Sequence, residues 1–241
     1  LGFWRIRKTF REEIAMTKQQ NNFLLSITHE LKSPLASLKL SMQTIQKRQL
    51  DAEHIKSMAD MSMDDIERLE LLVENILLAS KIESANFSLN RELMDLSTIT
   101  TTIYDKIIIK HSGQRKFLTE IEKDIYIYGD RFSFSSVIYN LIENAIKYSA
   151  ADAEITVALT GDEKNAYLSV KDTGIGIPGT EKSRIFERFY RIGTEETRKT
   201  KGTGLGLFIV KHVVEMHKGS IQVKNNSPKG SIFEVSIPVG A

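Results

Sequence analysis

With 241 residues, the chain is long enough for two domains that each bury their own core. Hydrophobic residues make up 41% of it and charged residues 27%, which is typical of a folded globular protein and excludes a disordered or membrane-embedded one. The net charge of +2 argues against a nucleic-acid partner, and the lack of cysteine excludes disulfides, thiol catalysis and cysteine-ligated metals.

The first residues combine an apolar stretch with a basic one. Residues 1–4 are apolar or aromatic, and Arg5, Arg7, Lys8 and Arg11 follow at once. This pattern is expected where a membrane helix ends on its cytoplasmic side. A frayed start of the first helix explains it equally well, because the apolar stretch has only four residues. No run of about eighteen apolar residues occurs in the chain, so no segment of it is predicted to span a bilayer.

Apolar residues predict a long amphipathic helix from about Phe10 to Arg48. They recur three or four apart at Phe23, Ile27, Leu31, Leu35, Leu38, Met42 and Ile45. His29 lies off this apolar face, so its imidazole should face solvent or a partner, where it can accept a phosphoryl group. Pro34 removes one helical hydrogen bond and should bend the helix just past the histidine. Taken alone, His29 also fits an ordinary helix with a solvated histidine.

A second long helix is predicted after the chain turns near Gln49. Asp51 is its expected N-cap, and it ends near Glu83. Its apolar stripe runs through Ile55, Met58, Ser62, Ile66, Leu69, Val73 and Ile76. A hairpin of two such helices cannot bury both stripes by itself, whereas two hairpins paired in a four-helix bundle can, which predicts a homodimer. We place the domain boundary after residue 84, giving domains 1–84 and 85–241.

The second domain alternates short strand patterns with helical ones. Helices are predicted at 96–111, 131–148 and 205–217, and strands at 117–121, 125–128, 155–159, 166–170, 220–224 and 231–237. A long loop is predicted from 178 to 203. This order favours an α+β fold with a mixed sheet that carries its helices on one face.

Three polar side chains share one face of the predicted helix 131–148. Asn140, Asn144 and Lys147 are spaced by four and three residues. An amide oxygen is a suitable ligand for Mg²⁺, and a lysine beside it can neutralise phosphate charge. On spacing alone, a simple polar helix face explains the three residues better.

An acidic residue and two glycines follow the predicted strand 166–170. Asp172 can accept a hydrogen bond from the exocyclic amino group of adenine, while Gly174 and Gly176 let the backbone approach a flat ligand. Guanine presents a carbonyl oxygen at the corresponding position and should be excluded. The alternative is a common Asp-Thr-Gly turn.

The end of the predicted loop is rich in glycine and opens a helix. Backbone N–H groups of residues 202–206 could cradle phosphates there, although the pattern is neither a P-loop nor a dinucleotide-binding fingerprint. Phe186 to Arg191 lie inside the loop, which is long enough to act as a lid. Arg191 could reach a terminal phosphate.

The segment Thr28 to Leu35, Thr-His-Glu-Leu-Lys-Ser-Pro-Leu, closely resembles the phosphoacceptor box of sensor histidine kinases from two-component signalling. The four clusters of the second domain resemble the asparagine box, first glycine box, phenylalanine box and second glycine box of the histidine kinase catalytic domain. That domain is an α/β sandwich of the ATPase superfamily that includes gyrase B, mismatch-repair and heat-shock chaperone ATPases. The resemblance covers nearly the whole chain.

This resemblance implies that the second domain binds ATP and Mg²⁺. Asp172 would bind the adenine amino group, Asn140 would hold Mg²⁺, and Asn144 and Lys147 would bind phosphates. The full set of implied nucleotide-binding residues is Asn140, Asn144, Lys147, Tyr148, Asp172, Gly174, Gly176, Arg191, Gly202, Thr203, Gly204, Leu205 and Gly206.

The resemblance also implies the catalytic residues of the first domain. His29 would attack the γ-phosphorus of ATP, and Glu30 would be the general base. Neighbouring helical residues do not ordinarily face each other, so a rotamer of the imidazole or the bend near Pro34 has to bring the two together. Ser33 stands where the family usually has Thr or Asn to orient a water that dephosphorylates the regulator, which puts phosphatase activity in doubt.

The implied partners are a second copy of the chain and the receiver domain of a response regulator. The implied location is the cytoplasmic face of the bacterial inner membrane, with a membrane tether upstream of Leu1. The alternatives are a sensor that acts mainly as a phosphatase, an ATP-driven conformational clamp without phosphohistidine, and a dimeric scaffold that has lost nucleotide binding.

Overall fold

The computed structural model describes residues 2–82, 84, 88–111, 115–193, 200 and 202–240, without the side chains of 2–6, 8–9, 11–12 and 15–16. The chain divides into two compact units, Leu1–Leu77 with Phe189–Leu205 and Leu78–Arg188 with Gly206–Ala241. The boundary predicted after residue 84 stays a prediction, because residues 83 and 85–87 lie outside the described ones.

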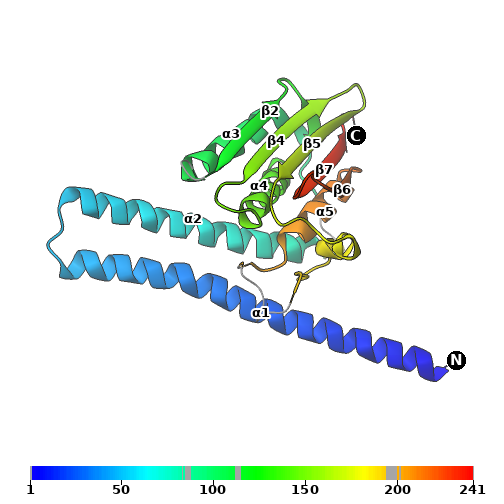
Figure 1. Ribbon diagram of the computed structural model, residues 1–241, viewed down its shortest axis with the longest axis horizontal. Helices are drawn as coiled ribbons and strands as arrows, with labels where there is room; N and C mark the ends of the chain where they lie inside the picture. Colours follow the sequence, from blue (N-terminus) through cyan, green and yellow to red (C-terminus); the bar gives the residue numbers. More distant parts are fainter. Residues whose placement is uncertain are drawn as a thin grey trace. The chain divides into compact units, whose positions relative to one another are not determined.

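The first unit contains a hairpin of two long helices. Helix α1 (Gly2–Lys47) and helix α2 (Ala52–Ile82) run antiparallel, as predicted (Figure 1). Asp51 precedes α2, and its Oδ1 accepts a hydrogen bond from the His54 backbone N–H at 2.8 Å, which is the N-cap expected from the sequence. Helix α1 continues through Pro34.

The hairpin leaves much of its apolar surface uncovered. Ser41 and Ser62 are buried, whereas Leu35 and Met42 of the predicted stripe are about half exposed, at 54% and 46%. Other exposed apolar side chains on the two helices are Phe10, Ile14, Leu24, Leu25, Leu40, Ile55, Met61, Met63, Ile66, Val73 and Leu77. A single hairpin therefore buries only part of its stripes, as the sequence predicted.

The apolar and basic residues at the start of the chain were predicted to lie near a membrane. Most of their side chains, those of residues 3–5, 8 and 11, lie outside the described ones. Along the described part of the chain, no helix is both long enough and apolar enough to cross a membrane.

The second unit is built on a mixed five-stranded sheet, as predicted. Its strands, in spatial order, are β2 (Lys116–Ile121), β4 (Glu154–Gly161), β5 (Asn165–Asp172), β7 (Ser231–Pro238) and β6 (Ser220–Asn225). Strand β2 is parallel to β4, and the remaining pairs are antiparallel. The last strand in the sequence, β7, therefore lies inside the sheet.

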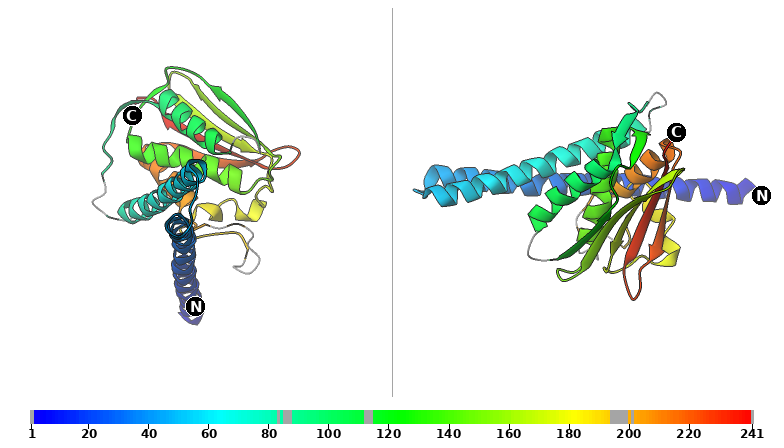
Figure 2. Two further views of the ribbon diagram at one scale, coloured as in Figure 1. Left: turned by 90° about the vertical axis from the view of Figure 1, so that its left-hand side faces the viewer. Right: turned by 90° about the horizontal axis from the view of Figure 1, so that it is seen from above.

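Three helices cover one face of this sheet (Figure 2). They are α3 (Leu96–His111), α4 (Arg131–Lys147) and α5 (Gly206–Met216). Alternate strand residues such as Val157, Val170 and Val235 point into the core, where Leu141 and Ile142 of α4 are fully buried. Because one face of the sheet is covered, β4, β5 and β7 alternate buried and more exposed residues. The same alternation in the sequence predicted these strands.

A two-stranded sheet stands beside the main one. Strand β1 (Glu92–Asp95) pairs antiparallel with β3 (Tyr126–Gly129). The sequence predicted β3 but not β1, which has four residues and only one buried side chain, Met94. Two short 3₁₀ helices, Gly179–Glu181 and Arg184–Phe186, lie inside the predicted loop 178–203.

Candidate functional site

His29 and Glu30 are neighbours on α1 but have different surroundings. His29 is exposed, as predicted, while Glu30 is buried. Successive helical residues project about 100° apart, so one side chain can face solvent while the next faces α2. Ser33 is also exposed, and its position four residues after His29 places both on the same side of α1.

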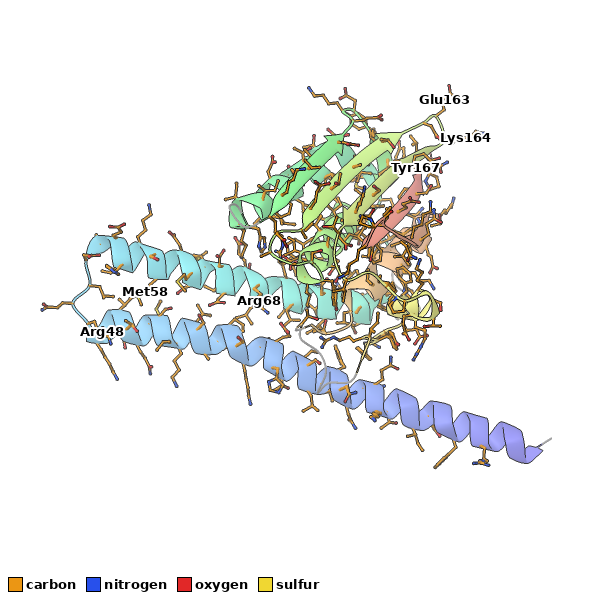
Figure 3. All side chains as sticks on the ribbon, viewed as in Figure 1. Arg48, Met58, Arg68, Glu163, Lys164 and Tyr167 are labelled. Atoms are coloured by element: carbon orange, nitrogen blue, oxygen red, sulfur yellow. The ribbon has the colours of Figure 1, made fainter. Side chains whose placement is uncertain are left out.

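The carboxylate of Glu30 forms an ion pair with α2. Arg68 Nη2 donates to Glu30 Oε2 at 2.8 Å, and Arg68 lies on α2 at the side that faces α1 (Figure 3). The Glu30 side chain is only 11% exposed, so the arginine compensates most of the cost of burying this charge. The described residues include no hydrogen bond between Glu30 and His29. Arg68 was not identified from the sequence, since it is 38 residues away from its partner.

Asn140 presents its amide oxygen in a defined direction. Its Nδ2 donates to the backbone oxygen of Ser136 at 2.9 Å and to Ser136 Oγ at 3.1 Å. A carbonyl oxygen can only accept, so the atom facing it must be the amide NH₂, and Oδ1 must point away from it. Oδ1 lies next to Gly206, where an added Cβ would come within 2.7 Å of it.

This oxygen fits a Mg²⁺ site of the kind that nucleotide enzymes use. The described residues contain no cluster of three or more His, Asp or Glu side chains that could hold a metal by themselves. Mg²⁺ commonly takes one or two protein oxygens and completes its shell with water and phosphate oxygens. Asn140 supplies such an oxygen, while Asn144 and Lys147 follow on the same helix face, partly exposed.

Asp172 ends β5 and is 4% exposed. Its Oδ1 accepts hydrogen bonds from the backbone N–H groups of Gly174 at 2.8 Å and Ser231 at 3.3 Å. Burial raises the pKa of this carboxyl, and the two N–H donors oppose that shift by stabilising the carboxylate. Among the described residues, no hydrogen bond reaches Oδ2, which is therefore the oxygen left to accept from a ligand.

The glycines after Asp172 allow close approach to the end of α4. An added Cβ on Gly174 would lie 2.4 Å from the Tyr148 backbone oxygen, so only glycine fits there. The Ile175 N–H donates to the same oxygen at 3.1 Å, and Gly176 adopts a positive φ of 73°. The first glycine cluster and Tyr148, predicted separately, are thus adjacent. Ser149 Oγ, also next to Gly174, is buried without a hydrogen-bond partner among the described residues.

The turn between β6 and β7 also contacts Asp172, which the sequence analysis did not foresee. Asn226 Nδ2 donates to the Asp172 backbone oxygen at 2.8 Å. The two residues are 54 positions apart. The predicted strands 220–224 and 231–237 require a turn between them, but nothing local in the sequence indicates which strand end that turn meets.

The segment Phe189–Leu205, which belongs to the first unit, is fastened at both ends. The Phe189 N–H donates to the Gly204 oxygen at 2.9 Å, and Gly204 has a positive φ of 74°. Arg191 Nη1 donates to the Gly202 oxygen at 2.8 Å, and Nη2 donates to the Thr200 oxygen. The Phe189 ring stacks on Phe23 of α1 with centroids 3.8 Å apart. Arg191, predicted to reach a terminal phosphate, here binds the backbone of the glycine segment.

The other residues of the second glycine cluster have local roles. The Thr203 hydroxyl accepts from the Leu205 N–H at 3.4 Å, and Leu205 is buried. Gly206 begins α5, so the cluster does open a helix, as predicted. The nucleotide roles given to Gly202, Thr203, Gly204, Leu205 and Gly206 stay predictions.

Two family models match the chain. Residues 19–85 match the His Kinase A (phospho-acceptor) domain, and residues 129–241 match the histidine kinase-, DNA gyrase B- and HSP90-like ATPase. His29, Glu30 and Ser33 fall in the first match, and all the predicted nucleotide-binding residues fall in the second.

Known proteins resemble the chain over most of its length. It is 34% identical to the sensor histidine kinase RppB of Synechocystis sp. over 92% of this chain and 50% of RppB. It is 30% identical to the sensor histidine kinase WalK of Bacillus subtilis over 94% of this chain and 38% of WalK. The histidine kinase AdeS of Acinetobacter baumannii has a similar structure, with a TM-score of 0.56 and 26% identity over 88% of this chain and 98% of AdeS. The chain thus spans half or less of the length of RppB and WalK.

Proposed function

The chain belongs to the sensor histidine kinases of two-component signal transduction. On that premise we propose that it phosphorylates His29 with ATP and passes the phosphoryl group to an aspartate of a response regulator. The observation that carries the proposal is the exposed position of His29 on α1, within the phosphoacceptor match of a chain that also has an ATPase match.

The base of ATP is recognised by Asp172. Its Oδ2 accepts a hydrogen bond from the exocyclic amino group of adenine, while Gly174 and Gly176 give the ring room to lie against the backbone. A guanine oxygen at the same place would face this carboxylate acceptor to acceptor, so GTP should bind poorly. The two backbone N–H groups that donate to Asp172 Oδ1 support this assignment, because they leave Oδ2 as the acceptor for the base.

The phosphates are held by α4 and by the glycine segment before α5. Asn140 Oδ1 would hold Mg²⁺, Asn144 and Lys147 would contact phosphate oxygens, and the backbone N–H groups of residues 202–206 would complete the cradle. The metal would supply positive charge that neutralises the phosphates. Arg191 approaches the terminal phosphate only if it releases the Gly202 carbonyl.

Transfer takes place when the γ-phosphate meets the His29 ring in line with its leaving oxygen. A ring nitrogen forms the N–P bond as the bond from phosphorus to the β–γ bridging oxygen breaks and ADP leaves. The proton on the other ring nitrogen passes to the Glu30 carboxylate. Glu30 must first leave Arg68, because the ion pair holds its carboxylate toward α2.

The active form is a homodimer, which the exposed apolar side chains of the hairpin support. We place it at the cytoplasmic face of the bacterial inner membrane, tethered by a segment upstream of Leu1. The basic residues that follow Trp4 in the sequence support that placement.

The decisive experiment is incubation of the protein with γ-labelled ATP. Wild type should acquire a covalent label that is stable to alkali and labile to acid, as a phosphoramidate is. His29→Gln should bind ATP normally and take up no label. A protein that hydrolyses ATP without labelling, and does so equally well with His29→Gln, would be a conformational clamp and would contradict the proposal.

A further inference from the structure

We infer that Asn226, in the turn between β6 and β7, is the positioning residue that sets Asp172 for base recognition. The inference rests on the proposed binding of ATP. Asn226 does not need to touch the nucleotide, since its amide acts on the main chain of Asp172, and Asp172 meets the base. Three observations carry the inference, all from residues within the second unit.

The first observation is how the β5–β7 ladder ends. Its last backbone pair is Lys171 with Ile232. One residue further, the Ser231 N–H donates to the Asp172 side chain, to Oδ1 at 3.3 Å. The Asp172 backbone oxygen accepts instead from Asn226 Nδ2 at 2.8 Å. The side-chain amide of Asn226 thus takes the place of a backbone N–H as donor to the Asp172 backbone oxygen. The Ser231 N–H donates to the Asp172 carboxylate instead.

The second observation is burial. Asn226 is 8% exposed and Asp172 is 4% exposed, so the bond between them is shielded from water. A shielded carbonyl that loses its donor has no water to replace it, and the cost is that of an unsatisfied buried group. The neighbouring Asn225, by contrast, is exposed.

The third observation is how closely the turn fits against Asp172. The Asn226 N–H donates to the Gly230 oxygen at 3.0 Å and closes the turn. Gly230 has a φ of 119°, and an added Cβ there would lie 2.0 Å from the Asp172 oxygen. The turn backbone therefore rests directly on Asp172, and any movement of the turn moves this residue.

Together these contacts fix both parts of Asp172. Asn226 holds its main chain, and the Gly174 and Ser231 N–H groups hold one carboxylate oxygen. The remaining oxygen then has a single direction in which to accept a hydrogen bond. Without the Asn226 amide, the turn is no longer held against the end of β5. The Ser231 N–H then shifts relative to Asp172, and the carboxylate loses its fixed orientation.

The test compares ATP with inosine triphosphate, which carries the same phosphates but has an oxygen in place of the amino group. Asn226→Asp is the central variant, because it keeps the shape of the side chain while replacing its donor with an acceptor. We expect its preference for ATP over inosine triphosphate to fall about tenfold, with little change in affinity for inosine triphosphate. Asn226→Gln keeps a donor and should recover part of the preference.

Asn225→Asp is the matched control, because it makes the same change one residue earlier at an exposed position. It should keep the wild-type preference. Affinities are measured by calorimetry on protein whose thermal unfolding confirms that it is folded. The inference is overturned if Asn226→Asp keeps the wild-type preference, or if both nucleotides weaken equally. Wild type that fails to bind ATP would overturn the proposed function itself, which separates the two failures.

Discussion

At the scale of single residues, the metal site proposed at Asn140 depends on how closely Gly206 fits against its side chain. Its NH₂ is held by two acceptors on Ser136, so its amide cannot swing away from an intruding atom without losing both bonds. Gly206 lies next to Oδ1, and an added Cβ would stand 2.7 Å from that oxygen. The lack of a side chain at the start of α5 therefore keeps a carbon atom from crowding the oxygen that we propose as a metal ligand.

Gly206→Ala should weaken ATP binding by about tenfold when Mg²⁺ is present and change it little when Mg²⁺ is chelated. The physical reason is that the new methyl group would crowd the Asn140 oxygen that we propose as the metal ligand. Gly179→Ala is the matched control, because its added Cβ would meet nothing within 4 Å. Calorimetric titrations of both variants with and without Mg²⁺ check the prediction. Equal weakening in the two conditions would show that Gly206 serves the phosphates or the fold instead.

The residues of the site differ in how far they could be predicted. Helical spacing places Asn140, Asn144 and Lys147 on one helix face, and Asp172 stands out between a strand and two glycines, because these signals are local. The nucleotide-binding roles predicted for them came from the family resemblance. Asn226 and Arg68 act across 54 and 38 residues of sequence, and only folding brings them to their partners. The direction of the Asn140 amide depends on Ser136, four residues earlier, so helical spacing could have found that contact.

At the scale of secondary structure elements, the Glu30–Arg68 pair joins α1 to α2. The Glu30 side chain is 11% exposed and that of Arg68 is 51% exposed, so the pair is partly shielded from solvent. Such a pair is worth less than its distance implies, because the arginine remains hydrated. Removing one partner is costly mainly because it leaves the buried carboxylate alone.

A double-mutant cycle on unfolding free energy should reveal a coupling of about 1 kcal/mol between Glu30 and Arg68. Arg68→Met should destabilise the hairpin, and adding Glu30→Gln should cost little more, because the neutral amide no longer needs a cation. The free energies come from urea unfolding followed by circular dichroism. Additive effects of the two substitutions would contradict the ion pair.

Helices and strands were predicted best where the apolar repeat continues over many residues. The prediction of a helix at 96–111 agrees with α3, because sixteen residues give several turns of periodic signal. Strand β1 was missed, because four residues with one buried side chain give no period to detect. The pairing of β2 with β4, parallel and without a direct connection, also could not be derived from the local pattern.

At the scale of the whole molecule, His217 links the end of α5 to the start of α4 in the second unit. Its Nδ1–H donates to the Val213 oxygen on α5 at 2.7 Å, and Nε2 accepts from the Asp130 N–H, at the start of α4, at 3.1 Å. The ring packs edge to face on Phe134. The charged groups around the ring are Asp130 and Arg91, which is the residue before β1. Burial lowers the pKa of His217, so the fold favours the neutral ring.

Acid should therefore destabilise the second unit. Because the folded-state pKa of His217 lies below its unfolded value, the unfolded chain binds the proton more readily. The contribution is complete above about pH 6.5 and falls below it by at most about 1.4 kcal/mol per pH unit. His217→Gln should remove this slope, whereas His54→Gln, on an exposed side chain, should keep it. Urea unfolding between about pH 5 and about pH 7.5 checks this, and an unchanged slope in His217→Gln would refute it.

The interior place of β7 has a consequence for biosynthesis. The ribosome releases this strand last among those of the sheet, yet it separates β5 from β6 and buries Phe233, Val235 and Ile237. Until Ser231–Pro238 has emerged, β5 keeps a free hydrogen-bonding edge that can join with a neighbouring nascent chain. A premature stop codon between Asp172 and Ser231 would therefore yield a product that aggregates through the uncovered edge of β5.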